Sequence, residues 1–408
     1  MQKVNDGISF DTIVVWLCLA SIACFIKIVP GLYLHDVILA GYCFTVLLAR
    51  NLKIDAVKNR YLTMLALYVY FPLLLSVLIN LIKDGGFKQS LSFFYYVWNV
   101  SIFILYAIAL DRLKPVIWRS NVYYVLLFVA APVILSEIML FVPKVAAIAK
   151  GLYRLDQVGV YGRFGGVYGT ALAGFAMHSF TVLFFALFLY QIRMIRFLPM
   201  FVFSLVGLLG VILSGIRAGL IVLLSLYVLL FLFRGFNLLG VKVLASMVVT
   251  IFLLLALVHV HNQNLFDYIV KRYSVERMLV DISVSDEGRQ KGNLHNFKRA
   301  LNRNLDFLGL YPKTILGGNS QLKHDMPYLD IVFKHGIIVA TVALVFLLYF
   351  FVRFGLYNAH DQSQLLLVCL IFASFVFSFK ANSVFHNIFM FTSIYLVTYL
   401  RKPIEQVG

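Results

Sequence analysis

Three residues of the chain combine a reactive or charged side chain with a position where it could take part in chemistry: Arg217, Arg289 and His324. Arg217 lies between two apolar runs, where a charge is costly unless it is paired or faces a wet cavity. His324 directly precedes Asp325 and is close to Asp330, and these acids could orient it as a base near neutral pH. These residue types suit the binding of an anion and the transfer of a proton.

Each of these residues also has a simpler interpretation. Arg217 could extend its charge from a helix end to the membrane surface. Arg289 could pair with Asp286 or Glu287 on a wet surface, where such a pair is worth under about 1 kcal/mol. Lys380 could anchor a short loop at the membrane interface. Both interpretations of these residues remain open from their types and spacing.

The elements that must position these residues are membrane helices. The chain is 62% hydrophobic and only 13% charged, whereas a soluble domain carries about 25% charged residues. Its apolar runs have the length of about 20 residues that crosses a bilayer core. Spanning backbone must satisfy its own hydrogen bonds, so these runs are predicted to be helices. The sequence therefore predicts an all-α polytopic membrane protein with a single membrane domain over residues 1–408.

About twelve spans are expected from the apolar runs. They cover residues 10–29, 32–49, 61–82, 91–110, 121–142, 168–190, 197–214, 217–233, 241–260, 328–352, 364–379 and 384–400. The first run is not followed by a small-residue cleavage site, so it is expected to be a retained helix and not a signal peptide.

The basic residues give the orientation of these spans. The net charge of +17 is concentrated in the loops between apolar runs, which argues against a nucleic-acid partner. With both termini in the cytoplasm, the short inner loops carry far more Lys and Arg than the short outer loops, as the positive-inside rule requires. Two longer segments then lie outside the cytoplasm, residues 143–167 and 261–327. The first should contain a helix along the outer interface, over 144–161, and the second a short helix over 292–305.

Both outer segments are basic. They are either solvated loop surfaces or the walls of a vestibule for an anionic substrate such as a lipid diphosphate. The cysteines (Cys18, Cys24, Cys43 and Cys369) lie within apolar runs, without zinc spacing. The histidines His259, His261 and His386 are isolated from further ligands, so neither a metal nor a cofactor is expected.

Four segments, taken in chain order, resemble motifs of the Wzy-type O-antigen polymerases, which belong to a superfamily that also includes O-antigen ligases. They are residues 163–169 (RFGGVYG), 214–219 (SGIRAG), Arg289 together with 316–318 (LGG), and 324–337 (HDMPYLDIVFKHGI). There are departures: Tyr168-Gly169 stand where Pro-Asn is often found, Asp325 replaces Asn or Ser, and Asn319 stands where a second glycine is common. The combination and order of the motifs carry the resemblance.

The resemblance implies a metal-independent glycosyltransferase of the membrane-embedded GT-C type. Such an enzyme joins oligosaccharide repeat units carried on undecaprenyl diphosphate at the periplasmic face of the bacterial inner membrane, and releases undecaprenyl diphosphate. Arg217 and Arg289 would stabilise the leaving diphosphate, and His324 would activate the attacking sugar hydroxyl. Substrate binding is expected of Arg163, Asp325, Tyr328, Asp330 and Lys380.

A chain-length regulator and a flippase of the same pathway would be partners of such a polymerase. Two other functions fit the same sequence. An O-antigen ligase, which transfers the whole glycan to lipid A core, shares the residues above. A flippase or secondary transporter for lipid-linked oligosaccharides would also have many spans and cationic sites. A transporter should carry its charges at mid-span, whereas the charges singled out here lie near one membrane face.

Overall fold

The structure of the chain is a computed structural model that describes residues 9–29, 32–48, 122–155, 157, 159–160, 163–169, 172–191, 193–215 and 255–274. It also describes isolated helical positions within 71–78, 113–116, 249–253 and 337–345. All structural statements below concern these residues.

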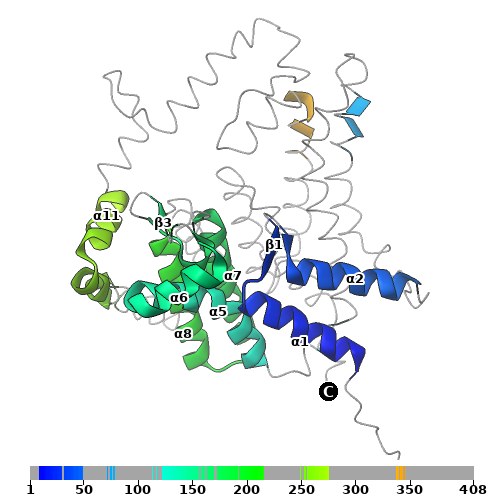
Figure 1. The fold of residues 1–408 in the computed structure, drawn as a ribbon, viewed down its shortest axis with the longest axis horizontal. Helices are drawn as coiled ribbons and strands as arrows, with labels where there is room; N and C mark the ends of the chain where they lie inside the picture. Colours follow the sequence, from blue (N-terminus) through cyan, green and yellow to red (C-terminus); the bar gives the residue numbers. More distant parts are fainter. Residues whose placement is uncertain are drawn as a thin grey trace, which may run out of the picture.

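The described part of the chain is mostly helical (Figure 1). The helices are α1 (Phe10–Ala23), α2 (Leu34–Leu48), α5 (Val122–Phe141), α6 (Pro143–Tyr153), α7 (Leu172–Gln191), α8 (Phe197–Leu213) and α11 (Gln263–Tyr273). Strands β1 (Lys27–Val29) and β2 (Leu32–Tyr33) form one antiparallel pair, and β3 (Gly159–Val160) and β4 (Arg163–Phe164) form another. A single 3-10 turn, η1, covers Gly166–Tyr168.

Five of these helices coincide with spans expected from the sequence: α1, α2, α5, α7 and α8. Helix α7 extends one residue beyond its expected span. In the part of the chain that the structure describes, α5 is the one helix long and apolar enough to cross a membrane, and α1, α2, α7 and α8 contain shorter apolar helical stretches. Residues 255–261 are helical at the end of the expected span 241–260. The remaining expected spans lie outside the described residues, apart from the isolated positions.

The first expected span is shorter than predicted. Helix α1 ends at Ala23, Phe25 has a positive φ of 50°, and residues 27–29 form strand β1 in place of a last helical turn. Pro30 accounts for the extended backbone at Val29, because a proline disfavours helical backbone in the residue before it. The β1–β2 hairpin turns the chain back, so α2 runs antiparallel to α1 and the ring of Phe10 stacks on Tyr42.

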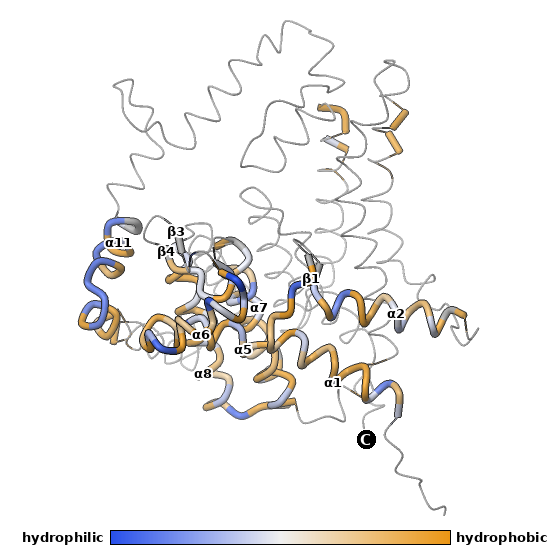
Figure 2. The backbone as a smooth tube through the Cα atoms, viewed as in Figure 1, coloured by the Kyte–Doolittle hydropathy of each residue, from blue (hydrophilic) through white to orange (hydrophobic). Residues whose placement is uncertain are grey.

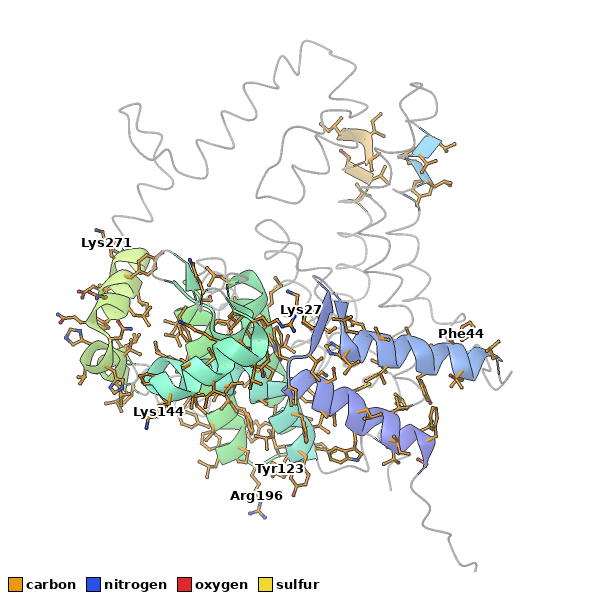
Figure 3. The ribbon with its side chains drawn as sticks, in the orientation of Figure 1. Lys27, Phe44, Tyr123, Lys144, Arg196 and Lys271 are labelled. Carbon is orange, nitrogen blue, oxygen red and sulfur yellow. The ribbon has the colours of Figure 1, made fainter. Side chains whose placement is uncertain are left out.

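Helices α7 and α8 form a second antiparallel hairpin, and α5 packs against both. Tyr123, at the start of α5, and Arg196, which precedes α8, project at the same end of this group (Figure 3). Helices α5 and α8 therefore run in one direction and α7 in the other. The core between them includes fully buried Phe175, Phe180 and Phe184.

The two outer segments begin with helices, but not with the expected bounds. Helix α6 ends at Tyr153 and not at residue 161, because Arg154 adopts a left-handed conformation (φ 49°) and the chain continues into β3. Helix α11, which the sequence analysis did not predict, opens the long polar segment after Asn262, whose side chain accepts a hydrogen bond from the Leu265 N–H. The expected helix over 292–305 lies outside the described residues.

Hydropathy separates these elements into two kinds (Figure 2). Helices α1, α5 and α8 are apolar along most of their length, whereas α6 and α11 alternate between polar and apolar positions. On α6, Ile148 is 64% exposed and Leu152 is 75% exposed, while Lys144 points away from the body of the protein (Figure 3). Such a helix, with apolar residues exposed beside basic ones, has the character of a helix that lies at a membrane surface.

Candidate functional site

The segment that resembles the mid-chain motif, residues 163–169, is here called the 163–169 loop. It starts in β4, where Arg163 is paired with Val160 of β3, and continues through η1. Gly166 and Gly169 have positive φ values of 54° and 58°. Glycine adopts this left-handed region without the steric cost that a Cβ atom imposes on other residues. The glycines of RFGGVYG therefore determine the path of this loop.

The same glycines allow the loop to lie directly against its neighbours. A Cβ atom on Gly166 would lie 2.2 Å from the Ser136 Cβ in α5. A Cβ atom on Gly165 would lie 2.2 Å from the Gly169 carbonyl oxygen. There is no space for any side chain at these two positions, so the loop and α5 are in backbone contact.

Ser136 connects this loop to α5 by hydrogen bonds. The Val167 N–H donates to the Ser136 Oγ at 3.2 Å, and the Ser136 hydroxyl donates to the Pro132 carbonyl oxygen at 2.7 Å. An N–H buried away from water needs such a partner, because an unpaired one costs about as much as a lost hydrogen bond. The serine thus satisfies a loop amide with a side chain that is itself held in place.

A second connection runs through two aromatic residues. The Tyr168 hydroxyl is hydrogen-bonded to Nδ1 of His178 in α7, and Nε2 of His178 lies 2.8 Å from the Val129 carbonyl oxygen in α5. His178 is 0% exposed and Tyr168 is 6% exposed. One side chain therefore joins the loop, α7 and α5 in the interior of the protein.

The end of α1 reaches the same place. The Phe25 ring centroid lies 4.4 Å from that of Tyr168, 5.3 Å from that of Tyr33 and 6.5 Å from that of Tyr153. Aromatic pairs at such separations stabilise a structure by about 0.5–1.5 kcal/mol beyond their buried area. Burial raises the pKa of the Tyr153 phenol, and a tyrosine is already uncharged at neutral pH with its ordinary pKa of about 10.

Glu137 is the acidic residue of this region. Its side chain is 8% exposed, and its Oε1 has no hydrogen-bond partner among the described residues. The backbone of Gly210 in α8 is within hydrogen-bonding reach of the carboxyl group. An ionised carboxylate with an unsatisfied buried oxygen is strongly unfavourable.

The motif at residues 214–219, which contains Arg217, is described only at its first two residues. Helix α8 ends at Leu213, the Ser214 hydroxyl donates to the Val211 carbonyl oxygen at 2.6 Å, and Gly215 has a positive φ of 63°. The helix therefore ends four positions before Arg217, within one residue of the predicted end of the span 197–214. Arg217 itself lies outside the described residues.

The other predicted site residues can be placed only in part. The backbone of Arg163 is described in β4, but nothing is described of its side chain. The remaining ones lie outside the described residues: Arg217, Arg289, His324, Asp325, Tyr328, Asp330 and Lys380. Their convergence on one site stays a prediction.

Three residues that the sequence analysis overlooked, Ser136, Glu137 and His178, lie around the 163–169 loop. A signal was available for two of them. Glu137 is the one acid in the apolar run 122–141, and His178 is the one titratable group in the middle of the run 172–189. An ionisable residue inside a membrane span is by default a candidate functional residue. Nothing in the sequence distinguishes Ser136 from other serines in apolar runs.

In this region, buried side chains hold the 163–169 loop by hydrogen bonds, and the loop begins with the backbone of Arg163. Within the part of the chain that the structure describes, no group of three or more His, Cys, Asp or Glu side chains could hold a metal ion. Comparisons with protein-family models, with curated proteins and with solved structures found no match to this chain.

Proposed function

We propose that the chain is a polymerase of O antigen or a similar surface polysaccharide in the bacterial inner membrane, with both termini in the cytoplasm. It would join undecaprenyl-diphosphate-linked repeat units at the periplasmic face. The observation that carries the proposal is the construction of the 163–169 loop. The motif whose resemblance suggested the family is packed without space for a Cβ atom at two positions, and it is anchored by Ser136 and His178.

The placement of the outer segments supports this proposal. The end of α1, helix α6 and the 163–169 loop meet at the aromatic cluster around Phe25. The start of the long polar segment lies close by, since Nε2 of His261 is 3.2 Å from the Phe141 carbonyl oxygen at the end of α5. In the proposed orientation all these segments belong to the periplasmic end. A lipid-linked sugar would be bound there.

The proposed reaction requires two kinds of groups. A sugar hydroxyl of one repeat unit attacks the anomeric carbon of the growing glycan, and the bond to the lipid diphosphate breaks. His324 takes the hydroxyl proton, and Arg217 and Arg289 stabilise the charge that develops on the diphosphate. Arginine suits this role because its guanidinium group stays charged and binds two phosphate oxygens at once. Arg163, Asp325, Tyr328, Asp330 and Lys380 hold the substrate.

Reconstitution tests the proposal. Purified protein in proteoliposomes is supplied with the undecaprenyl-diphosphate-linked repeat unit of its host, and the glycan products are separated by length. The wild type should form a ladder of polymers, and Arg217→Ala and Arg289→Ala should abolish the ladder while still inserting in the membrane. A wild type that forms no polymer would refute the polymerase function. A normal ladder from both variants would remove the arginines from the mechanism.

Gene deletion separates a polymerase from a ligase. Loss of a polymerase leaves a single repeat unit on lipid A core. Loss of a ligase leaves the glycan on the undecaprenyl carrier. The first phenotype supports the proposal and the second replaces it.

A lipid-linked oligosaccharide transporter is the second candidate, and Glu137 is the observation that favours it. A buried carboxyl group in an apolar helix is typical of proton-coupled transport. However, Glu137 lies one turn before the end of α5, next to Ser136, which bonds to the 163–169 loop. A transporter should instead carry its charges at mid-span. A fluorescent lipid-linked sugar that crosses the bilayer in the wild type but not in Glu137→Gln would support transport. Polymer formation by both proteins without any crossing would exclude it.

A further inference from the structure

We infer that His178 and Ser136 are positioning residues that hold the 163–169 loop, and with it Arg163, in the geometry needed to bind the diphosphate. This inference rests on the proposed function for its chemistry. The anchoring of the loop itself rests on hydrogen bonds between buried groups. No motif named in the sequence analysis includes His178 or Ser136.

The hydrogen bonds of His178 determine its protonation. A backbone carbonyl oxygen only accepts hydrogen bonds, so Nε2 must carry a proton to bond the Val129 oxygen at 2.8 Å. In the neutral ring Nδ1 is then an acceptor, and the Tyr168 hydroxyl donates to it. Both ring nitrogens are thus used, and the ring is oriented by α5 on one side and the loop on the other.

Ser136 provides a second anchor from α5. Its hydroxyl donates to the Pro132 carbonyl oxygen at 2.7 Å and accepts from the Val167 N–H at 3.2 Å. Two neighbouring loop residues, Val167 and Tyr168, are therefore attached to the same helix, one directly and one through His178. This arrangement restrains both the position and the rotation of the loop.

The anchors at Val167 and Tyr168 also restrain Arg163, because the loop between them is closely packed. Gly165 and Gly166 are in contact with the Gly169 carbonyl oxygen and with Ser136, at distances that exclude a Cβ atom. On the other side of the glycines, Arg163 and Phe164 are paired with Val160 and Gly159. A shift of Tyr168 or Val167 would therefore move the β4 backbone, to which Arg163 belongs.

Anchoring of this kind matters for binding a diphosphate. A binding group works when its supporting shell holds it within a fraction of an ångström, and a misplacement of 1 Å can cost about 100-fold in rate. The loop anchors are buried and neutral, so they would act through Arg163 without touching the substrate.

The activity test is a double-mutant cycle with Arg163. His178→Ala should lower kcat/KM for the lipid-linked repeat unit by about 10-fold to 100-fold. His178→Gln should recover most of this loss, because its amide can donate to Val129 and accept from Tyr168. In the Arg163→Ala background, His178→Ala should add nearly nothing. Losses that multiply in the double variant would overturn the inference.

A readout independent of activity keeps the two proposals separate. Hydrogen exchange of the backbone amides of residues 164–169 should become at least about 10-fold faster in His178→Ala, and stay near the wild-type rate in His178→Gln. His261→Ala is the matched control, since it also removes a histidine bonded to a carbonyl of α5 but lies at the exposed end of the helix. It should leave loop exchange unchanged.

Unchanged loop exchange in His178→Ala would refute the anchoring. Faster exchange in a protein that forms no polymer would retain the anchoring and refute the proposed function. If His178→Ala does not fold, Tyr168→Phe replaces it. That variant keeps both rings and removes one hydrogen bond, and it should raise loop exchange by a smaller factor in the same direction.

Discussion

The α1–α2 hairpin and the α7–α8 hairpin have similar apolar composition but are packed in opposite ways. In α1–α2 both helices have exposed apolar side chains: Leu17 in α1 is 52% exposed and Phe44 in α2 is 63% exposed. In α7, by contrast, all residues from 175 to 186 are buried. The first pair leaves such side chains to lipid or to parts of the chain outside the described residues, while the second forms an interior.

Small residues explain this difference. Gly207 and Gly210 of α8 lie against Ser179 of α7, where a Cβ atom would approach to 2.5 Å and 2.2 Å respectively. Helices in lipid associate through such small residues, because close backbone approach replaces the hydrophobic force that is absent there. The glycine of α2, Gly41, has no atom within 4 Å of its added Cβ position.

Both hairpins also contain buried polar groups. In α5 and α7, Ser136, His178 and Ser179 bond to neighbouring backbone groups. In α2, His35 and Asp36 are buried next to each other. In α1–α2 the Tyr42 hydroxyl donates to the Asp11 carboxylate at 2.8 Å, in a part-buried position. The comparison indicates that α5, α7 and α8 form the tightly packed part of the described chain, which carries the 163–169 loop, and that α1 packs against α5.

The largest expected effect comes from the same substitution made in both hairpins. Gly207→Ala would place a Cβ atom 2.5 Å from the Ser179 carbonyl oxygen and 2.8 Å from the Leu183 nitrogen. Backbone atoms cannot move aside, so the free energy of unfolding should fall by about 3 kcal/mol. Gly41→Ala should raise it by about 0.5–1 kcal/mol, because alanine favours helix and nothing is crowded. Denaturant unfolding in mixed micelles measures both; a change of the same sign in the two variants would break the comparison.

The next effect concerns the loop on α5. Gly166→Ala combines a φ of 54° with a Cβ atom 2.2 Å from the Ser136 Cβ. We expect a loss of about 2 kcal/mol, since a loop can shift more easily than a helix pair. Thermal unfolding, monitored through the aggregation of the unfolded protein, measures this loss of stability. Gly151→Ala is the control, because its added Cβ atom in α6 has nothing within 4 Å.

A smaller effect is expected between α1 and α2. Tyr42→Phe removes the hydrogen bond to the Asp11 carboxylate and should lower the free energy of unfolding by about 1 kcal/mol. The same micelle unfolding experiment applies. A loss as large as that of Gly207→Ala would mean that α1–α2 is as rigid as α7–α8.

The smallest effect belongs to the exposed start of α1. The Ser9 hydroxyl accepts from the Thr12 N–H at 3.2 Å and caps the helix. Ser9→Ala should cost about 0.5 kcal/mol, the low end for a helix cap, and Ser9→Asp should restore it. Circular dichroism during thermal unfolding checks this. A result near 2 kcal/mol would show that α1 depends on its own cap more than on packing.

Several features of this chain follow from the sequence alone. Apolar runs located α1, α2, α5, α7 and α8, since a buried or lipid-covered segment of this length must form its own hydrogen bonds. Helix α8 ends within one residue of the predicted end of the span 197–214. Gly215 allows the chain to leave the helix there, because glycine accepts the positive φ of 63°. Pro30 was a local signal against helix at residue 29, to which the first span was predicted to extend. The asparagine cap before α11 was a similar local signal.

The tertiary structure alone decided which face of each helix is interior and what surrounds the 163–169 loop. In a membrane protein the lipid-facing and the protein-facing sides are both apolar, so periodicity does not tell them apart. The loop's anchors are also remote in sequence: Val167 and Ser136 are 31 residues apart, and His178 and Val129 are 49 apart. Side chains at such separations meet only through the packing of α5 against α7, which no local pattern encodes.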